Sequence, residues 1–382
     1  MPIQTWTVTD IENQIHHTQW SEELAPGVTA RLQTLQGGKK QGVESLRIES
    51  EPFTFEVLPT RGMNIWKVWT GKFEFGWKSP VKGPVHPNWV ETMEPGGLGW
   101  LDGFDELLVR CGLESNGAPE FDQQGRLQYP LHGRIANLPA QKLTVSINDH
   151  QVKITGVVEE SRFHFMKMQM TSTVTWEIGT TKLAISDEIQ NLSASDGECQ
   201  MLYHINFGIP LLDVGTQLIA PVKTVVPRNE HAASAIADWQ SYQGPTTGFE
   251  EQVYFLELNG DQNGDTQTVL KDAHGTRGVA IDHNIRDLPC YTVWKNTTAI
   301  EDGYVTGLEP GTNFPNPRSF EGEQGRVLKI PGLGSRTMKV GLDFLSEPQA
   351  VQNAIAQTQK LMPDTTQTFD RPQQGWCHGV EN

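Results

Sequence analysis

The sequence predicts an all-β protein, built as a single large antiparallel β-sandwich with a few short helices. Three observations support this fold class. Short runs of alternating apolar and polar residues follow one another along the chain, 37 glycines and 23 prolines separate them, and no helical pattern stands between consecutive runs. Alternation with a period of two is typical of strands whose two faces meet different surroundings. The lack of intervening helices disfavours a parallel sheet with helical crossovers.

The alternation is clearest in residues 163–178, where His164, Met166 and the following even-numbered residues oppose polar odd-numbered ones. Turn-rich stretches such as NGDQNGD (259–265) are expected to connect strands as hairpins or longer loops. Ten segments show strand patterns: 54–58, 152–158, 163–178, 181–189, 201–207, 267–270, 278–281, 291–295, 326–330 and 337–344.

Two regions depart from the strand pattern. The Gly-rich, aromatic segment 96–116 (GGLGWLDGFDELLVRCGLESN) predicts a short helix at 103–109. Near the C-terminus, Ser346 and Gln349 resemble a capping box, and the apolar residues that follow have helical spacing. We therefore expect a helix over 347–361 and an extended tail after it. The predicted domains are a sandwich over 1–345, with the helix and tail of 346–382 packed on it.

Composition and charge exclude several functions. The 382 residues include 30 Lys+Arg and 46 Asp+Glu, a net charge of −16, which disfavours binding to nucleic acid or to an anionic membrane surface. No apolar run reaches about 18 residues, and the first ten residues lack the pattern of a signal peptide. The four cysteines, which lack CxxC spacing, are typical of unpaired thiols in a reducing compartment; they are Cys111, Cys199, Cys290 and Cys377. We expect a cytoplasmic protein.

The common catalytic signatures, GxxxxGK[ST], GxGxxG, GxSxG and HExxH, do not occur. The remaining candidates for catalytic or binding residues lie in four short polar clusters at strand ends. In LPTRGMNI (58–65), Arg61 offers a rigid fork of donors, although a surface arginine at a turn would look the same. In YPLHGRIAN (129–137), His132 lies between a proline turn and a glycine, where a structural histidine is the alternative.

The other two clusters pair polar and apolar side chains. In MLYHINFG (201–208), His204 and Asn206 share one strand face, either as the floor of a site or as a solvent edge. In TGLEPGTNFPN (306–316), Glu309 precedes a rigid Pro-Gly turn, and burial there would raise its pKa toward that of a general base. Asn313 and Phe314 after it suit sugar recognition, with a polar edge and an apolar face.

The order of these clusters resembles the aldose 1-epimerase (galactose mutarotase) family over about residues 30–345. The resemblance implies a β-supersandwich that interconverts the anomers of a free aldose without metal or cofactor. It implies that Glu309 is the general base for the C1 hydroxyl and His204 the general acid at the ring oxygen. It further implies substrate binding by Arg61 and His132.

The sequence also departs from the best-known members of this family. Their strand motif, Asn-His-x-Tyr-Phe-Asn, is replaced by Tyr-His-Ile-Asn-Phe-Gly around His204, and segment 96–116 has no counterpart. For the family's substrate-gripping aspartate, Asp238 and Asp282 are both candidates, with Asp282 favoured. The chain therefore resembles a DUF4432-like branch of the superfamily, with a sugar of its own. Deoxy, sulfo and 6-phosphorylated aldoses all stay among the candidate substrates.

Three functional hypotheses follow. The first is a cofactor-free sugar mutarotase or epimerase, with Asn206, Asn313 and Phe314 also lining the substrate. Trp100 and Trp294 are further candidates for stacking surfaces, with core packing as the alternative. The second is a non-catalytic carbohydrate-binding or sensing protein on the same fold. The third is a metal-assisted isomerase or lyase, whose ligands would come from a set without compact spacing: His132, His204, Glu94, Glu114 and His283. The expected partner is a small carbohydrate, and a monomer or a homodimer is compatible with the exposed edge strands of a sandwich.

Overall fold

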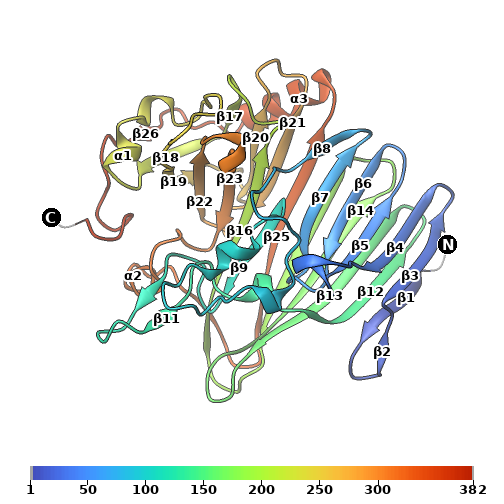
Figure 1. The fold of residues 1–382 in the computed structure, drawn as a ribbon. Helices are drawn as coiled ribbons and strands as arrows, with labels where there is room; N and C mark the ends of the chain where they lie inside the picture. The colour runs from blue at the N-terminus through green and yellow to red at the C-terminus, as the bar shows by residue number, and fades with distance from the viewer. Residues whose placement is uncertain (1–2, 381–382) are drawn as a thin grey trace. The chain divides into compact units, whose positions relative to one another are not determined.

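The computed structural model describes residues 3–380, and strands dominate throughout (Figure 1). The chain forms two compact units. The first comprises residues up to 74, 81–200 and 328–339, and the second 75–80, 201–327 and the residues from 340 onward. Each unit is built mostly from antiparallel strands with only short helices, so the all-β fold class is confirmed. Among the described residues, no helix is long and apolar enough to cross a membrane.

The first unit contains a small two-stranded sheet and two large sheets whose inner faces meet. One has the strand order β2-β1-β12-β13-β14-β15 and the other β3-β4-β5-β6-β7-β9. Their strands are β1 (Gln4–Asp10), β2 (Ile15–His16), β12 (Ala140–Ile147), β13 (Gln151–Ser161), β14 (Lys167–Glu177) and β15 (Lys182–Asn191), then β3 (Gln19–Ala25), β4 (Val28–Thr34), β5 (Glu44–Glu49), β6 (Phe53–Leu58), β7 (Asn64–Thr70) and β9 (Leu108–Leu113).

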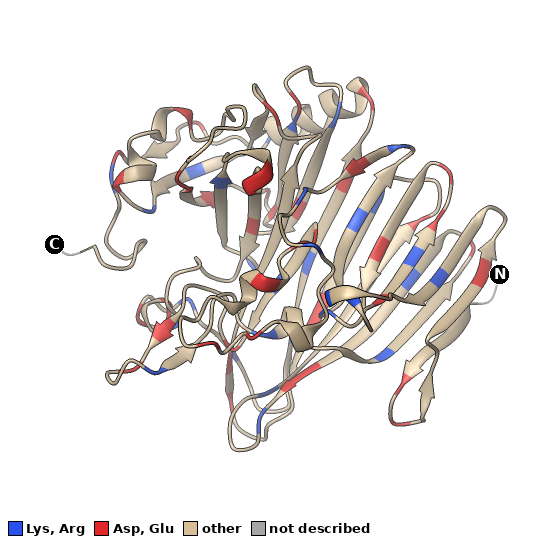
Figure 2. Ribbon diagram, viewed as in Figure 1, with Lys and Arg blue, Asp and Glu red and all other residues tan. Residues whose placement is uncertain are grey.

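Side chains from both sheets fill the core of the first unit. The ring of Phe53 on β6 packs 6.0 Å from that of Trp176 on β14. Arg110 on β9 is fully buried, and its guanidinium group donates to both carboxylate oxygens of Asp187 on β15 and to the hydroxyl of Ser172. A buried charge costs little only when it is paired and hydrogen bonded in this way. Arg47 on β5 also pairs with Glu56 on the neighbouring strand β6 at 2.8 Å. Figure 2 shows basic and acidic positions distributed along the strands.

The second unit also has two sheets. One has the order β17-β20-β21-β25 and the other β26-β18-β19-β22-β23-β16, of which β16 and β25 begin in the first unit. The strands are β16 (Gly197–Gly208), β17 (Gln217–Ile219), β18 (Val222–Pro227), β19 (Gln252–Leu258), β20 (Asp265–Lys271), β21 (Gly278–Asn284), β22 (Cys290–Asn296), β23 (Val305–Gly311), β25 (Ser335–Leu345) and β26 (Gln367–Thr368).

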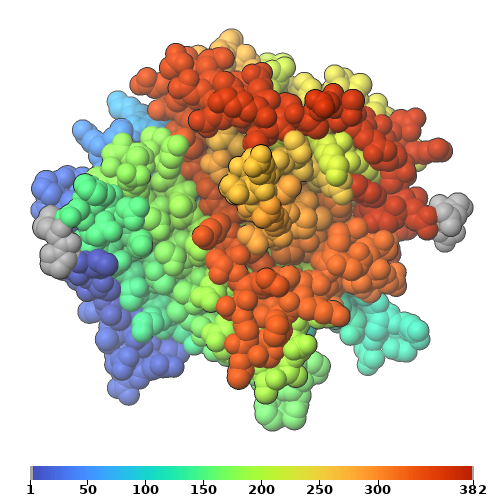
Figure 3. Space-filling view, turned by 180° about the vertical axis from the view of Figure 1, so that it is seen from behind, coloured from blue at the N-terminus to red at the C-terminus, as the bar shows by residue number. Residues whose placement is uncertain are grey.

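Short elements complete the two units. They are β8 (Phe73–Phe75), β10 (Glu120–Phe121), β11 (Leu127–Tyr129) and β24 (Leu328–Ile330), the helices α1 (Glu230–Ala233), α2 (Arg318–Glu323) and α3 (Pro348–Gln359), and 3₁₀ helices at Gly38–Lys40, Pro87–Trp89, Gly99–Gly103, Ile135–Asn137, Ile236–Asp238 and Ile300–Asp302. Helix α3 packs on β20 through Val351 and Ala354, and Figure 3 shows the C-terminal segment in red on the surface of the second unit.

Two local predictions are wrong. The helix expected at 103–109 is absent: a 3₁₀ helix ends at Gly103, and β9 begins at Leu108. A helix would need the Leu107 N–H to reach the Gly103 carbonyl, but the first donates to Trp66 O and the second accepts from Arg61. The strand expected over 163–178 begins only at Lys167, because residues 162–166 form the turn between β13 and β14.

The C-terminal helix exists, but the expected capping box does not form. Its N-cap is Glu347, without a side-chain hydrogen bond, and Pro348 occupies the first helical position. Proline fits there because its fixed φ is helical and its missing N–H would have no helical partner. The side chain of Gln349 instead donates to Asn353, one turn further along the helix. The predicted domain boundary at residue 345 stays a prediction.

Candidate functional site

The two proton-transfer candidates meet on adjacent strands of the second unit. Asn206 on β16 lies opposite Gly307 on β23, which places His204 level with Glu309. On the other side of β23, Thr292 of β22 lies opposite Glu309. Directly opposed residues of antiparallel strands point to the same face, so this alignment brings the imidazole and the carboxyl group together. The sequence placed the two residues more than one hundred positions apart, and strand register unites them.

His204 and Glu309 form a close, buried pair. Nε2 of His204 lies 3.2 Å from Oε1 of Glu309, and the two side chains are only 5% and 2% exposed. Gly307 makes room for the pair. A Cβ at this position would lie 2.4 Å from Oε1 of Glu309 and 3.0 Å from Cε1 of His204. A side chain at this position would therefore disturb the close approach of these two residues, whereas the backbone conformation would accept it.

Burial shapes the chemistry of Glu309. Its pKa is raised well above the ordinary value, first by desolvation and then by the negative charge of Glu251, while Arg228 lowers it. Desolvation favours the neutral carboxyl because a buried charge loses its hydration. A carboxyl group of raised pKa in contact with an imidazole can accept or release a proton near neutral pH, which is what general acid–base chemistry requires.

Trp294 and Asn206 surround the histidine. The indole of Trp294 stands edge-on to the His204 ring at 5.5 Å, and its Nε1 donates to Glu251, which also accepts from Arg228. Oδ1 of Asn206 lies 2.6 Å from Nδ1 of His204. The sequence suggested Trp294 as a stacking surface and Asn206 as a substrate ligand. In the structure, both contact His204 directly.

Asn313 and Phe314 lie in a packed environment. Asn313 is fully buried, where its Nδ2 donates to the carbonyl of Phe314 and its Oδ1 accepts from the hydroxyl of Thr312. The Phe314 ring stacks on Phe255 at 4.7 Å and on Trp376 at 5.1 Å. Both side chains are buried and make their contacts within the unit. Their predicted contacts with substrate stay a prediction.

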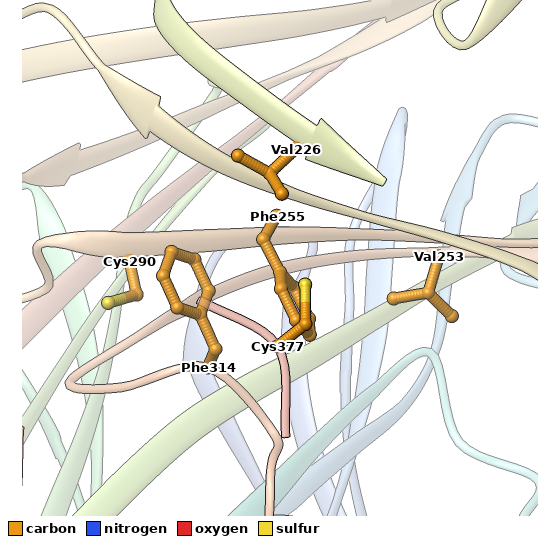
Figure 4. Close-up of a cluster of buried hydrophobic side chains, with 6 residues drawn as sticks. All are labelled: Val226, Val253, Phe255, Cys290, Phe314 and Cys377. Carbon is orange, nitrogen blue, oxygen red and sulfur yellow. The ribbon is translucent and has the colours of Figure 1, made fainter. Parts of the chain in front are cut away.

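The C-terminal tail covers part of the sheet face that carries Glu309. Phe255 on β19 lies opposite Thr292 and Val253 lies opposite Trp294, so these side chains share the face of Glu309. Cys377 packs into this cluster (Figure 4), and Trp376 packs against it. The sequence predicted a tail packed on the sandwich, but not that it would lie on this face. The available signal was the set of apolar residues Phe369, Trp376 and Val380 in an otherwise polar tail.

The two aspartate candidates lie elsewhere in the second unit. Asp282 is on an exposed position of β21, in the sheet that does not contain β16 and β23, and accepts a hydrogen bond from Gln267 at 2.8 Å. Asp238 ends an exposed 3₁₀ helix, and its backbone carbonyl accepts from Lys295. The structure therefore does not bring Asp282 to the His204–Glu309 pair, and its role in gripping substrate stays a prediction.

His132 belongs to a loop of the first unit. Its backbone is left-handed, with φ of 56°, and its half-buried ring packs edge-on against Trp100 at 4.6 Å. Nδ1 of His132 lies 2.9 Å from the backbone carbonyl of Asn116. Because a carbonyl only accepts, Nδ1 carries the ring proton. The predicted candidate for stacking, Trp100, is buried against this histidine.

Arg61 is an internal clamp of the first unit. It is 1% exposed and pairs with Glu106. Its Nη atoms donate to the carbonyls of Val85 and Gly103 and to Oδ1 of Asn137. Four of the five N–H donors of the guanidinium group thus have protein acceptors. This geometry favours a positioning role in the loop of residues 85–106, and the predicted contact with substrate stays untested.

Arg134, which follows His132 closely, joins two carboxylates. It donates to Glu114 at 3.0 Å and to Glu160 at 3.3 Å. Burial raises the pKa of Glu160 to about 7, against the opposing effect of Arg134. The partners come from distant strands, so the sequence held no local signal for this network.

The residues proposed as metal ligands do not gather. Within residues 3–380, no three His, Cys, Asp or Glu side chains are arranged to hold a metal ion. His283, one of the candidates, is buried on β21, stacks on Tyr291 at 5.6 Å, and has its pKa lowered to about 3 by burial. The metal-assisted hypothesis gains no support from this arrangement.

Solved structures share this fold across the chain. A galactose mutarotase-like protein from Clostridium acetobutylicum superposes with a TM-score of 0.57 at 13% identity, over 86% of this chain and 98% of that one. Galactose 1-epimerase from Lactobacillus acidophilus gives 0.53 at 11% identity, over 83% and 98%. At such low identity the likeness defines the fold alone. The protein has the galactose mutarotase-like fold, as the sequence predicted.

A more similar protein narrows the family. The structure of a candidate aldose 1-epimerase from Klebsiella pneumoniae superposes with a TM-score of 0.94 at 32% identity, over 97% of this chain and 99% of that one. The family model described as a domain of unknown function, DUF4432, matches residues 40–344. This chain belongs to the DUF4432 family, within the mutarotase-like superfamily. A search of curated proteins found no significant match.

Proposed function

We propose that the protein is a cofactor-free sugar mutarotase that interconverts the anomers of an aldose or an aldose derivative. The observation that carries the proposal is the buried contact between His204 and Glu309, 3.2 Å apart on facing strands. The names of the structural relatives support the same reaction class, an isomerase of the aldose 1-epimerase type. The substrate class follows from that likeness, and deoxy, sulfo and 6-phosphorylated aldoses remain the candidates.

The reaction needs two proton transfers at two oxygens of one sugar ring. In the proposed mechanism, Glu309 as carboxylate removes the proton from the C1 hydroxyl while His204 as imidazolium protonates the ring oxygen. The C1–O5 bond then breaks and the C1 carbonyl forms, giving the open-chain aldehyde. After rotation about C1–C2, His204 takes the proton from the C5 hydroxyl as it attacks C1, and Glu309 returns its proton to the new C1 hydroxyl.

Several site assignments stay part of the proposal. His132 is assigned to the ring oxygen and Arg61 and Asp282 to substrate binding by family resemblance, and the contacts of Arg61 point instead toward support of its loop. A cytoplasmic location and a role in carbohydrate metabolism belong to the same proposal. A monomer or homodimer is expected in solution.

The first test is anomeric exchange measured by NMR with a panel of free, deoxy, sulfo and 6-phosphorylated aldoses. Glu309→Gln and His204→Asn should each slow the accelerated exchange by about 10²–10⁴-fold, the usual contribution of a general acid or base. Glu257→Gln makes the same change on β19, at a position that is not aligned with His204 and Glu309, and should leave the rate close to wild type. Near-normal activity in both site variants would disprove the assignment of the pair.

The same experiment separates the sensing hypothesis. Saturable binding of one sugar, seen as selective line broadening, without any acceleration of its anomeric exchange would replace the mutarotase with a carbohydrate-binding protein on this fold.

A further inference from the structure

We infer that Asn206 is a positioning residue that fixes the tautomer of His204. It holds the ring proton on Nδ1 and leaves Nε2, the nitrogen beside Glu309, as the only one that exchanges protons. This assignment differs from the sequence-based expectation that Asn206 binds substrate. Its importance for catalysis rests on the proposed mutarotase function, whereas the tautomer itself does not.

The orientation of the Asn206 amide is set by the backbone. Its Nδ2 donates to the carbonyl oxygen of His204 at 3.1 Å. Since a carbonyl oxygen can only accept, the amide cannot be turned around without placing two acceptors against each other. The atom that faces His204 is therefore the amide oxygen, 2.6 Å from Nδ1.

The amide oxygen in turn determines where the imidazole carries its proton. It has no hydrogen to donate, so a contact of 2.6 Å with Nδ1 requires an Nδ1–H. The hydrogen bond made by one ring nitrogen decides the protonation of the other. Nε2 is then a bare acceptor in the neutral ring and a donor in the imidazolium. In both states Nε2 is the ring nitrogen that faces Oε1 of Glu309, 3.2 Å away.

The support for this arrangement is rigid. Asn206 is fully buried and lies two residues after His204 on β16, so both side chains project from the same face. Opposite Asn206, Gly307 has no side chain to displace the amide. The pairing of β16 with β23 that aligns His204 with Glu309 therefore also fixes the position of Asn206. An imidazole free to choose its tautomer would present Nε2–H to the carboxyl part of the time.

The test is the tautomer of His204 in protein labelled with ¹⁵N-histidine, read from long-range ¹H–¹⁵N correlations and assigned with His204→Asn. Wild type should show a protonated Nδ1 and a bare Nε2 in the neutral ring. Asn206→Asp keeps an acceptor at Nδ1, with its other carboxyl oxygen protonated so that it still donates to the His204 carbonyl, and should keep this pattern. Asn206→Leu removes it and should move the proton to Nε2. Asn296→Leu, which removes a side chain that donates to the Gly303 carbonyl in the same unit, should leave the pattern unchanged.

Activity supplies the second readout. Asn206→Leu should slow anomeric exchange by about 10–100-fold, the usual cost of losing a partner that orients a functional histidine, and Asn206→Asp should lose less. A bare Nδ1 in wild type, or an unchanged tautomer in Asn206→Leu, would overturn the inference. If Asn206→Leu does not fold, wild type and Asn206→Asp still decide it. The predicted tautomer without acceleration of any sugar would sustain this inference and reject the proposed function.

Discussion

The two candidate histidines present the same nitrogen through very different backbones. His204 lies within a regular strand of the second unit, and a side-chain oxygen from Asn206 holds its Nδ1. His132 lies in a loop of the first unit with φ of 56°, and the backbone carbonyl of Asn116 holds its Nδ1. In each case an oxygen acceptor holds the ring proton on Nδ1.

The difference predicts how each histidine responds to mutation. A side-chain acceptor can be removed by one substitution, so the tautomer of His204 is sensitive to the identity of residue 206. A backbone carbonyl is present whatever side chain occupies position 116, so the tautomer of His132 depends on the path of the loop. We therefore expect mutations around His132 in the first unit to change mainly the stability of the protein. Mutations around His204 in the second unit should change mainly its catalytic activity.

The largest expected effect is in the clamp that supports the loop of His132. Arg61 holds the carbonyl of Gly103, at the end of the 3₁₀ helix that carries Trp100 against His132. Arg61→Leu would leave Glu106 buried without its charge partner. Loss of one member of a buried pair typically costs about 3–5 kcal/mol, which chemical unfolding should detect.

The matched control is Arg126→Leu, which breaks a surface ion pair with Asp122 in the same unit and should cost far less, because exposed ion pairs contribute little to stability. Equal costs for the two arginine variants would contradict the clamp role of Arg61. An unchanged stability combined with a weaker affinity for sugar would restore the substrate-binding role that the sequence suggested.

Features that leave a pattern in the sequence, such as strand alternation or a family motif, could be predicted, whereas contacts between irregular segments could not. The pairing of His204 with Glu309 was predictable in kind, because strand alternation and family resemblance marked both residues. The clamp role of Arg61 was not, because its acceptors at Val85, Gly103 and Glu106 come from an irregular segment with no periodicity. The expected helix at 103–109 failed for the same reason, since contacts from Arg61 and Trp66 override local propensity there.

A smaller loss of stability is expected when alanine replaces Gly133, in the loop that carries His132. Gly133 has φ of 71°, and a Cβ there would lie 2.1 Å from the Ser115 carbonyl oxygen and 2.3 Å from that of Gly112. Gly133→Ala should therefore cost at least about 2 kcal/mol, because a left-handed backbone and a backbone clash act together. Chemical unfolding checks the cost, and ¹⁵N-histidine NMR should show a shifted environment for His132.

Gly125→Ala is the control, because its φ is also positive while the space around it is open. A cost no greater than that of the control would show that the loop yields easily.

The smallest loss of stability is expected at Gly307, on the regular strands of the second unit. A Cβ at this position would meet the end of the Glu309 side chain and the His204 ring, not backbone, so the carboxyl group can turn aside. Alanine also orders a strand with less loss of entropy than glycine, and the net change in unfolding free energy should stay within about 1 kcal/mol. Displacing the carboxyl by about 1 Å can nevertheless cost about 10²-fold in rate, which the anomeric exchange assay would measure. Gly307→Ala should thus separate activity from stability, whereas Gly133→Ala should reduce both. If Gly307→Ala unfolds as readily as Gly133→Ala, the contrast between a strand-borne and a loop-borne histidine is wrong.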